Sequence, residues 1–195
     1  MKMKAFLILE DGTVFEGIHI GAEKEIISEI VFNTSMAGYL EVLTDPSYAG
    51  QAVCMTYPLI GNYGVCREDC ESRRPWPDGF IVRELSRMPS NFRSDCTIQE
   101  YLEIHGVPGI AGIDTRALTK ILREKGTMNG MITTNADYCP EEILPRLAEY
   151  TTGKVVEKVT CEAKYEIRGV KDLADNGPLS GSAVFNKEEI GRAHV

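Results

Sequence analysis

The sequence predicts an α+β domain in which strands come first and helices follow. Short apolar runs separated by Gly, Pro and Asp turns fill the first 113 residues, a pattern typical of strands. Apolar residues at helical spacing appear after residue 97. The chain contains no Gly-x-Gly-x-x-Gly and no Gly-Lys-Ser/Thr loop, so a doubly wound nucleotide-binding fold is not expected.

The first two strands form a predicted β-hairpin. Residues 5–9 are apolar and stop at the turn 10–12, where Gly12 can adopt a positive φ. The returning strand carries the apolar side chains Val14, Phe15, Ile18 and Ile20. Further strands are expected at residues 29–33, 51–57, 79–83 and 109–113, which are apolar runs bounded by turn residues.

Two helices have clear ends in the sequence. Thr97 and Glu100 form a capping box, and Gly106 can close the helix that follows. Asp114 is the predicted N-cap of a second helix that ends at Gly126. Its apolar positions repeat at helical spacing, at Ala117, Leu118, Ile121 and Leu122.

The character of the chain changes near Gly153. A third helix is expected from Pro140 to about residue 150, interrupted by Pro145. Residues 154–159 are interpreted as one more strand, and residues 169–195 are polar, contain glycine and lack periodicity. The sequence therefore predicts a domain at residues 1–153, followed by a linker or irregular tail at residues 154–195.

Composition excludes several classes of protein. With 43% hydrophobic and 26% charged residues, the chain is globular, not disordered or collagen-like. The net charge of −8 disfavours nucleic acid as a partner, because an acidic body repels phosphates. No apolar run is long enough for a membrane span, and the N-terminus does not resemble a signal peptide. We therefore expect a cytoplasmic protein with no membrane partner.

The six cysteines are scattered, which favours free thiols over disulfides. Cys66 and Cys70 could form half of a zinc site, but no second pair follows at ligand spacing, so no metal site is expected. A cysteine hydrolase that uses Cys54 or Cys96 with His105 is a further hypothesis, although no local motif marks such a pair.

Four segments are rich in small hydroxyl, amide and glycine residues. They comprise residues 32–39, 41–48, 56–64 and 112–116. Such loops allow close approach of a polar ligand or of another domain. The alternative is that Asn, Ser and Asp only cap turns, and that the tyrosines serve packing. From the residues alone no catalytic mechanism follows, and both interpretations stay open.

These segments also carry a resemblance to a known family. Three further motifs accompany them: Leu9-Glu10-Asp11-Gly12-Thr13-Val14-Phe15-Glu16-Gly17, Ser90-Asn91-Phe92-Arg93 and Arg116-Ala117-Leu118-Thr119. Together these segments resemble the N-terminal domain of the glutamine-hydrolysing small subunit of carbamoyl phosphate synthase. The likeness extends from about residue 4 to about residue 153. It implies a layered β/β/α swivelling domain.

The resemblance also implies function and partners. A class I amidotransferase domain normally follows this domain and releases ammonia from L-glutamine with a cysteine nucleophile. The ammonia passes to a large subunit, which uses ATP, Mg²⁺ and bicarbonate to make carbamoyl phosphate for arginine and pyrimidine synthesis. The N-terminal domain contacts the large subunit and contributes one residue, here Ser47, to the glutamine pocket. No cofactor is expected in this chain.

The sequence departs from the family at its C-terminal end. The nucleophile motif Gly-Gly-x-Cys-Leu-Gly does not occur in the 195 residues, so no catalytic residue is assigned and no glutamine hydrolysis is expected. Asn33, Ser35 and Gly38 are assigned to loop architecture or to the boundary with another domain. The alternative function is a stand-alone, non-catalytic binding module that retains this fold.

Overall fold

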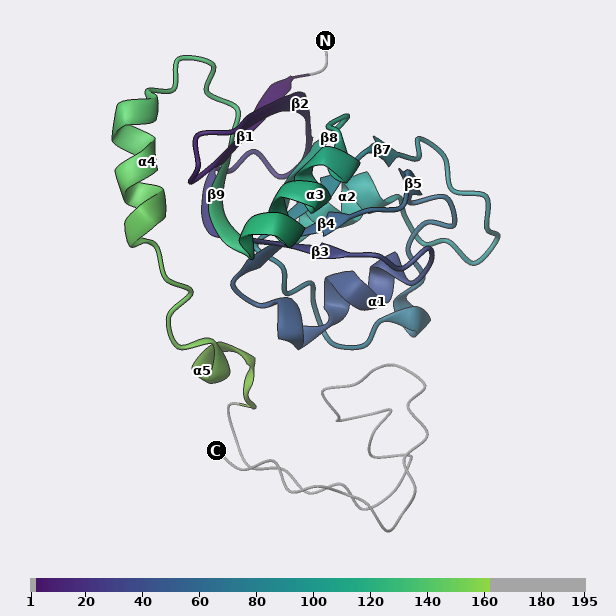
Figure 1. Ribbon diagram of the computed structural model, residues 1–195. Helices are drawn as coiled ribbons and strands as arrows, with labels where there is room; N and C mark the ends of the chain where they lie inside the picture. Colours follow the sequence, from purple (N-terminus) through teal and green to yellow (C-terminus); the bar gives the residue numbers. More distant parts are fainter. Residues whose placement is uncertain (1–2, 162–195) are drawn as a thin grey trace.

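The computed structural model describes residues 3–161, which form a closed barrel of seven strands surrounded by helices (Figure 1). The strand order around the barrel is β1-β2-β8-β6-β4-β3-β9. These strands are β1 (Lys4–Leu9), β2 (Val14–Gly21), β3 (Ile26–Asn33), β4 (Gln51–Met55), β6 (Gly79–Val82), β8 (Pro108–Ala111) and β9 (Met128–Thr133). Two shorter strands, β5 (Leu59–Ile60) and β7 (Glu84–Leu85), pair beside the barrel.

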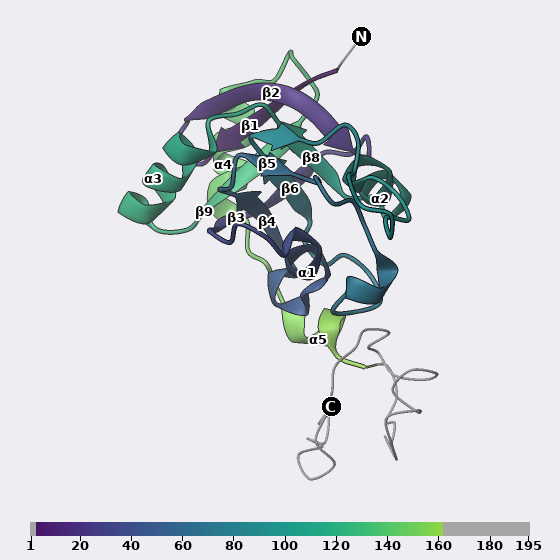
Figure 2. The ribbon, with the colours of Figure 1, turned by 90° about the vertical axis from the view of Figure 1, so that its right-hand side faces the viewer.

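Five α-helices and two short 3₁₀ turns complete the described part of the chain. They are α1 (Tyr39–Thr44), α2 (Ile98–Ile104), α3 (Thr115–Lys125), α4 (Pro140–Glu149), α5 (Val155–Val159), η1 (Pro46–Tyr48) and η2 (Arg67–Asp69). Helix α4 packs on β9, α3 on β3 and β4, and α2 on β2. Figure 2, turned by a right angle, shows α2 and α3 on opposite sides of the barrel.

Strand direction divides the barrel into two parts. β3, β4, β6 and β8 are adjacent and parallel, whereas β1, β2 and β9 join them through antiparallel pairs. The carboxyl ends of the four parallel strands therefore meet at one rim of the barrel. Loops that follow parallel strands at such a rim commonly build binding sites.

The central strands are buried on both faces, because successive side chains point to opposite sides of a strand. In β4, Ala52 and Cys54 face a core shared with Leu118 and Leu122 of α3. Val53, on the alternate face, joins a second core that includes residues of α1 and α2. A third, smaller core lies between β1, β9 and α4. This double burial explains the short, continuous apolar runs in the sequence.

Most predicted elements are confirmed. The α+β class, the 5–20 hairpin and the strands at 29–33, 51–57, 79–83 and 109–113 are present, with small shifts of their ends. Both helix caps occur as expected: Thr97 and Glu100 form the capping box, and Asp114 Oδ1 accepts from Ala117 N at 3.0 Å. Helix α4 tolerates Pro145, an exposed residue. The layered β/β/α arrangement stays a prediction, since the strand pairing describes one barrel.

One predicted element is wrong. Within the segment 154–159, residues Val155–Val159 form the helix α5 instead of a strand. A closed barrel has no free edge to which another strand could pair, so the valines of this segment form a local helical turn instead. The predicted tail at residues 169–195 lies outside the described residues. Within residues 3–161, no helix has the length and apolarity that crossing a membrane requires.

Candidate functional site

The carboxyl ends of the parallel strands bring three of the four polar segments to one rim. Residues 32–39 follow β3, residues 56–64 follow β4, and residues 112–116 follow β8. Arg83, directly after β6, joins them. The fourth segment, residues 41–48, comprises most of α1 and the turn η1, and it is linked to the first by side chains.

Two tyrosines connect the first and third segments. The rings of Tyr39 and Tyr63 stack with centroids 4.1 Å apart. The Tyr39 hydroxyl donates to the Gly64 carbonyl at 2.8 Å and accepts from the Tyr63 N–H at 3.2 Å. The Tyr63 hydroxyl accepts from the Gly38 N–H at 2.8 Å. Burial raises the pKa of both phenols, which keeps both hydroxyls protonated. These tyrosines thus serve packing.

The serine that the resemblance singles out lies on a well-supported turn. Asp45 Oδ1 accepts from the Ser47 N–H at 2.8 Å and thereby caps η1. Tyr48 accepts from Asn33 Nδ2 at 3.0 Å, and Asn33 Oδ1 accepts from the Ser35 N–H at 2.7 Å. Asn33 is therefore part of the loop architecture, one of the two roles expected for it. Ser47 itself is exposed, and its hydroxyl has no hydrogen-bond partner within residues 3–161.

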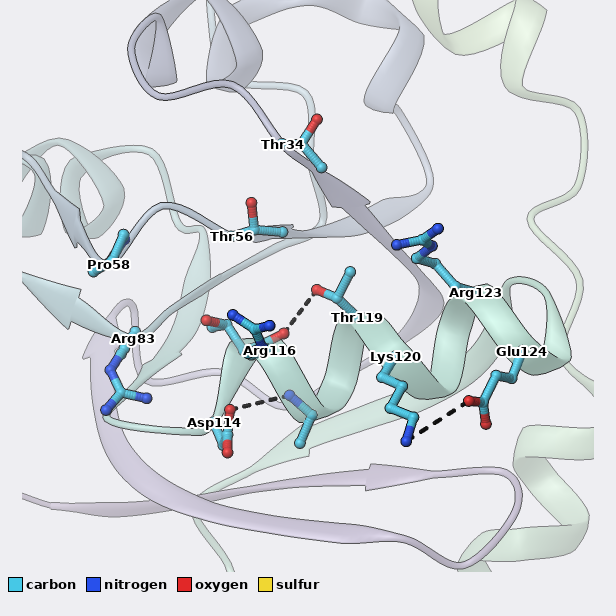
Figure 3. Close-up of a pocket in the computed structure, with 12 residues that line it drawn as sticks. Thr34, Thr56, Pro58, Arg83, Asp114, Arg116, Thr119, Lys120, Arg123 and Glu124 are labelled. Atoms are coloured by element: carbon cyan, nitrogen blue, oxygen red, sulfur yellow. Dashed lines mark hydrogen bonds and ion pairs between the residues drawn. The ribbon is translucent and has the colours of Figure 1, made fainter.

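A groove of about 1020 Å³ lies between α3 and the ends of the parallel strands (Figure 3). Arg116, Lys120 and Arg123 line it from α3, where the spacing i, i+4, i+7 places them on one face. Thr34 and Thr56 lie across from the helix, at the ends of β3 and β4 (Figure 3). Arg83, Pro58, Asp114, Thr115, Ala117, Thr119 and Glu124 complete the lining.

The charge of the groove is mostly uncompensated. Asp114 is engaged as the N-cap of α3, and Glu124 contacts Lys120 at 3.9 Å, a long and exposed pair. Arg83, Arg116 and Arg123 form no ion pair with any residue of the described part of the chain. The groove is therefore a positively charged hollow on an acidic protein.

The thiols are poorly placed for catalysis. Cys54 is completely buried in the barrel core, and burial raises its pKa to about 12. Burial also raises the pKa of Cys96. His105 caps α2 and contacts the Tyr101 ring, with centroids 4.5 Å apart; neither thiol bonds to it in the described region. The geometry disfavours a cysteine–histidine pair. Residues 3–161 also contain no cluster of three or more metal-ligating side chains.

Three groove residues were not predicted from the sequence, namely Arg83, Lys120 and Arg123. The spacing of Arg116, Lys120 and Arg123 on a predicted helix could have revealed a cationic face. Arg83 could not be found in this way, because only the pairing of β6 with β4 and β8 brings it to the rim.

Comparison with known proteins identifies the family. Residues 7–132 match the family model described as carbamoyl-phosphate synthase small chain, CPSase domain. The chain is 53% identical over 167 residues to the carbamoyl phosphate synthase small chain of Clostridium perfringens, an alignment that covers 86% of this chain and 48% of the relative. It is 54% identical over 174 residues to the protein of the same name from Listeria innocua, covering 89% and 46%.

A third relative has a higher identity over a shorter stretch. The carbamoyl phosphate synthase small chain of Nitratidesulfovibrio vulgaris is 58% identical over 135 residues, which is 69% of this chain and 36% of the relative. The chain spans about half the length of the curated relatives it matches. With a family model that matches more than half of its residues, the chain belongs to the carbamoyl-phosphate synthase small chain family and contains the CPSase domain of that family.

Proposed function

We propose that this chain acts in the cytoplasm as the partner-binding N-terminal part of a glutamine-hydrolysing carbamoyl phosphate synthase. In this proposal it docks on a large subunit, which binds ATP and Mg²⁺, as a layered, swivelling domain. It also completes the glutamine pocket of an amidotransferase domain. The observation that carries the proposal is the Ser47 hydroxyl, which is exposed and unpartnered in the described region on a turn held by Asp45.

The setting of Ser47 supports a role at a protein boundary. Its backbone is fixed by Asp45, and Asn33 links the neighbouring Tyr48 to the turn at residues 34–37. That turn exposes 77% of Met36. A hydroxyl can donate to a carboxylate or accept from an ammonium group, and L-glutamine carries both. Methionine side chains adapt to many binding partners, so Met36 offers an apolar contact to a domain that covers this turn.

The proposal assigns no chemistry to the thiols of this chain. The Gly-Gly-x-Cys-Leu-Gly motif does not occur in the 195 residues, and burial of Cys54 favours the unreactive thiol over the thiolate. We expect the 195-residue chain to hydrolyse no glutamine. Turnover of glutamine by the purified chain, measured as ammonia release, would contradict this assignment.

The Ser47→Ala variant tests the glutamine role. It is made in a small chain that continues this sequence into an amidotransferase domain, and it is assayed with the large chain. Loss of a hydrogen bond to a charged group costs about 1.5–3 kcal/mol, so we expect KM for glutamine to rise roughly 10- to 100-fold with kcat little changed. Ser90→Ala, at another exposed serine, is the matched control and leaves KM unchanged. An unchanged KM in Ser47→Ala removes the glutamine role.

Docking is tested separately. We expect the 195-residue chain to bind the large chain in a calorimetric titration, because in this proposal the N-terminal domain makes the contact with the large subunit. A folded chain that shows no heat of binding and no co-migration with the large chain in gel filtration would refute the docking proposal and favour a stand-alone binding module.

A further inference from the structure

The positively charged groove beside α3 has no role in the glutamine pocket proposed above. Four cationic side chains line it, namely Arg83, Arg116, Lys120 and Arg123, against the carboxylates of Asp114 and Glu124. All four cationic residues are exposed, and the three arginines lack an ion pair in residues 3–161. We infer that the groove receives an acidic segment of a partner protein.

The chemistry of the groove favours carboxylates. Three of its four cations are arginines, whose planar guanidinium groups bind carboxylates in a bidentate manner. The residues Arg116 and Lys120 lie one helical turn apart, about 6 Å along the axis of α3. Acidic side chains at alternate positions of an extended segment lie about 7 Å apart on one face, a similar spacing. The hydroxyl-bearing residues Thr34 and Thr56 lie across the groove, where they can contact the backbone of such a segment.

The groove fits a protein segment better than a small anion. Its volume of about 1020 Å³ is at the upper limit of the roughly 300–1,000 Å³ that is usual for small-ligand pockets. Such pockets place a few buried polar groups at fixed positions. Here the charged groups are exposed, and no buried side-chain nitrogen or oxygen in the described residues lacks a hydrogen-bond partner. Exposed arginines around an open groove are instead typical of protein interfaces.

The acidic segment in the groove is assigned to the large subunit, and only this identity of the partner rests on the proposed function. The decisive variant is Arg116→Glu/Arg123→Glu in the 195-residue chain, which reverses two charges on one face of α3. Arg146→Glu/Arg87→Glu is the matched control, because it reverses two exposed arginines outside the groove lining. Circular dichroism and thermal melting establish that each variant is folded.

Binding is measured with three probes: the large chain, a fluorescent octaglutamate peptide, and pyrophosphate as a competitor. We expect the groove variant to bind the large chain and octaglutamate at least tenfold more weakly, and the control variant to bind both like the unmodified chain. The affinity of the unmodified chain should fall as salt rises from 50 to 300 mM, and this dependence should be smaller in the groove variant. Glu124→Lys, which removes a negative charge from the groove, should bind both acidic probes more tightly.

The possible results separate the two proposals. If the groove variant binds the large chain as tightly as the unmodified chain, the groove assignment is wrong while the docking proposal stands. If the unmodified chain does not bind the large chain, docking is refuted. Binding of octaglutamate then tests whether the groove receives an acidic segment. If octaglutamate binds the unmodified chain and the control variant but not the groove variant, the result supports an acidic partner. If octaglutamate does not bind the unmodified chain, the inference is overturned. If pyrophosphate binds through the same arginines more tightly than octaglutamate does, the groove is a small-anion site. This result also overturns the inference of an acidic protein segment.

Discussion

Replacing Tyr39 by phenylalanine tests whether the tyrosine pair holds the polar loops together. The Tyr39 side chain is only 1% exposed, and its hydroxyl connects two backbone groups of the loop after β4. Phenylalanine retains the ring and its stacking on Tyr63. The substitution therefore removes the two hydrogen bonds and leaves the apolar contacts in place.

The expected loss of folding free energy follows from the two backbone groups that lose their hydrogen-bond partner. The Gly64 carbonyl and the Tyr63 N–H are left without the Tyr39 hydroxyl, and a buried polar group without a partner costs about 1–3 kcal/mol. Tyr63 is only half-buried, so water can compensate its N–H in part. We expect Tyr39→Phe to lower the free energy of unfolding by about 2–3 kcal/mol. For a chain of this length, that lowers Tm by about 4–12 °C.

Urea denaturation and thermal melting of the 195-residue chain measure this effect. Tyr138→Phe is the matched control, because Tyr138 packs on Phe6 and its hydroxyl makes no hydrogen bond in the described residues. It should change stability by less than about 0.5 kcal/mol. Tyr63→Phe, combined with Tyr39→Phe, should give a non-additive double-mutant cycle, since the two rings stack and each hydroxyl accepts from the backbone N–H of the other residue. If Tyr39→Phe is as stable as Tyr138→Phe, the tyrosine pair does not hold the loops.

Two further predictions concern stability. Thr97→Ala should destabilise the chain by about 1 kcal/mol in urea denaturation, because it removes the capping box of α2, whereas Thr151→Ala at an exposed position should have no effect. The raised pKa of Cys54, about 12 in the folded chain, should reduce stability as pH rises from about 9, because the unfolded chain loses the thiol proton first. The loss should approach about 1.4 kcal/mol per pH unit. Cys54→Ala should show a shallower decline, and parallel curves for the two proteins would contradict the assignment.

Local chemistry made much of the fold predictable. The hairpin turn at Gly12 and the caps at Thr97 and Asp114 depend on residues within a few positions of one another, so the sequence contains all the necessary information. Barrel closure depends on pairs such as β3 with β9, whose residues are about 100 positions apart in the chain. Nothing local in the sequence specifies that register.

Two missed elements show how tertiary packing hides a local pattern. β9 contains Asn129 and Gly130, which are uncommon in strands. A side chain at residue 130 would place its Cβ 2.7 Å from Ile30 Cγ1, so the packing of β3 against β9 requires glycine. Helix α1 begins after Gly38 without a side-chain cap, and its sequence therefore has no start signal. The stacking of Tyr39 on Tyr63 depends on the position of α1, so the sequence could not predict this contact either.

The overall charge of the chain gives the groove a role in orientation as well as in attraction. The net charge is −8, whereas in the groove positive side chains outnumber negative ones by two. An acidic partner is therefore repelled by most of the protein and attracted at the face that α3 and the parallel strand ends form. Repulsion elsewhere excludes wrong orientations, which a neutral protein with the same groove could not do. Thr34 lines this groove, and its neighbour Asn33 donates to the hydroxyl of Tyr48, the residue after Ser47, so these side chains connect the groove to the segment that carries the proposed glutamine contact.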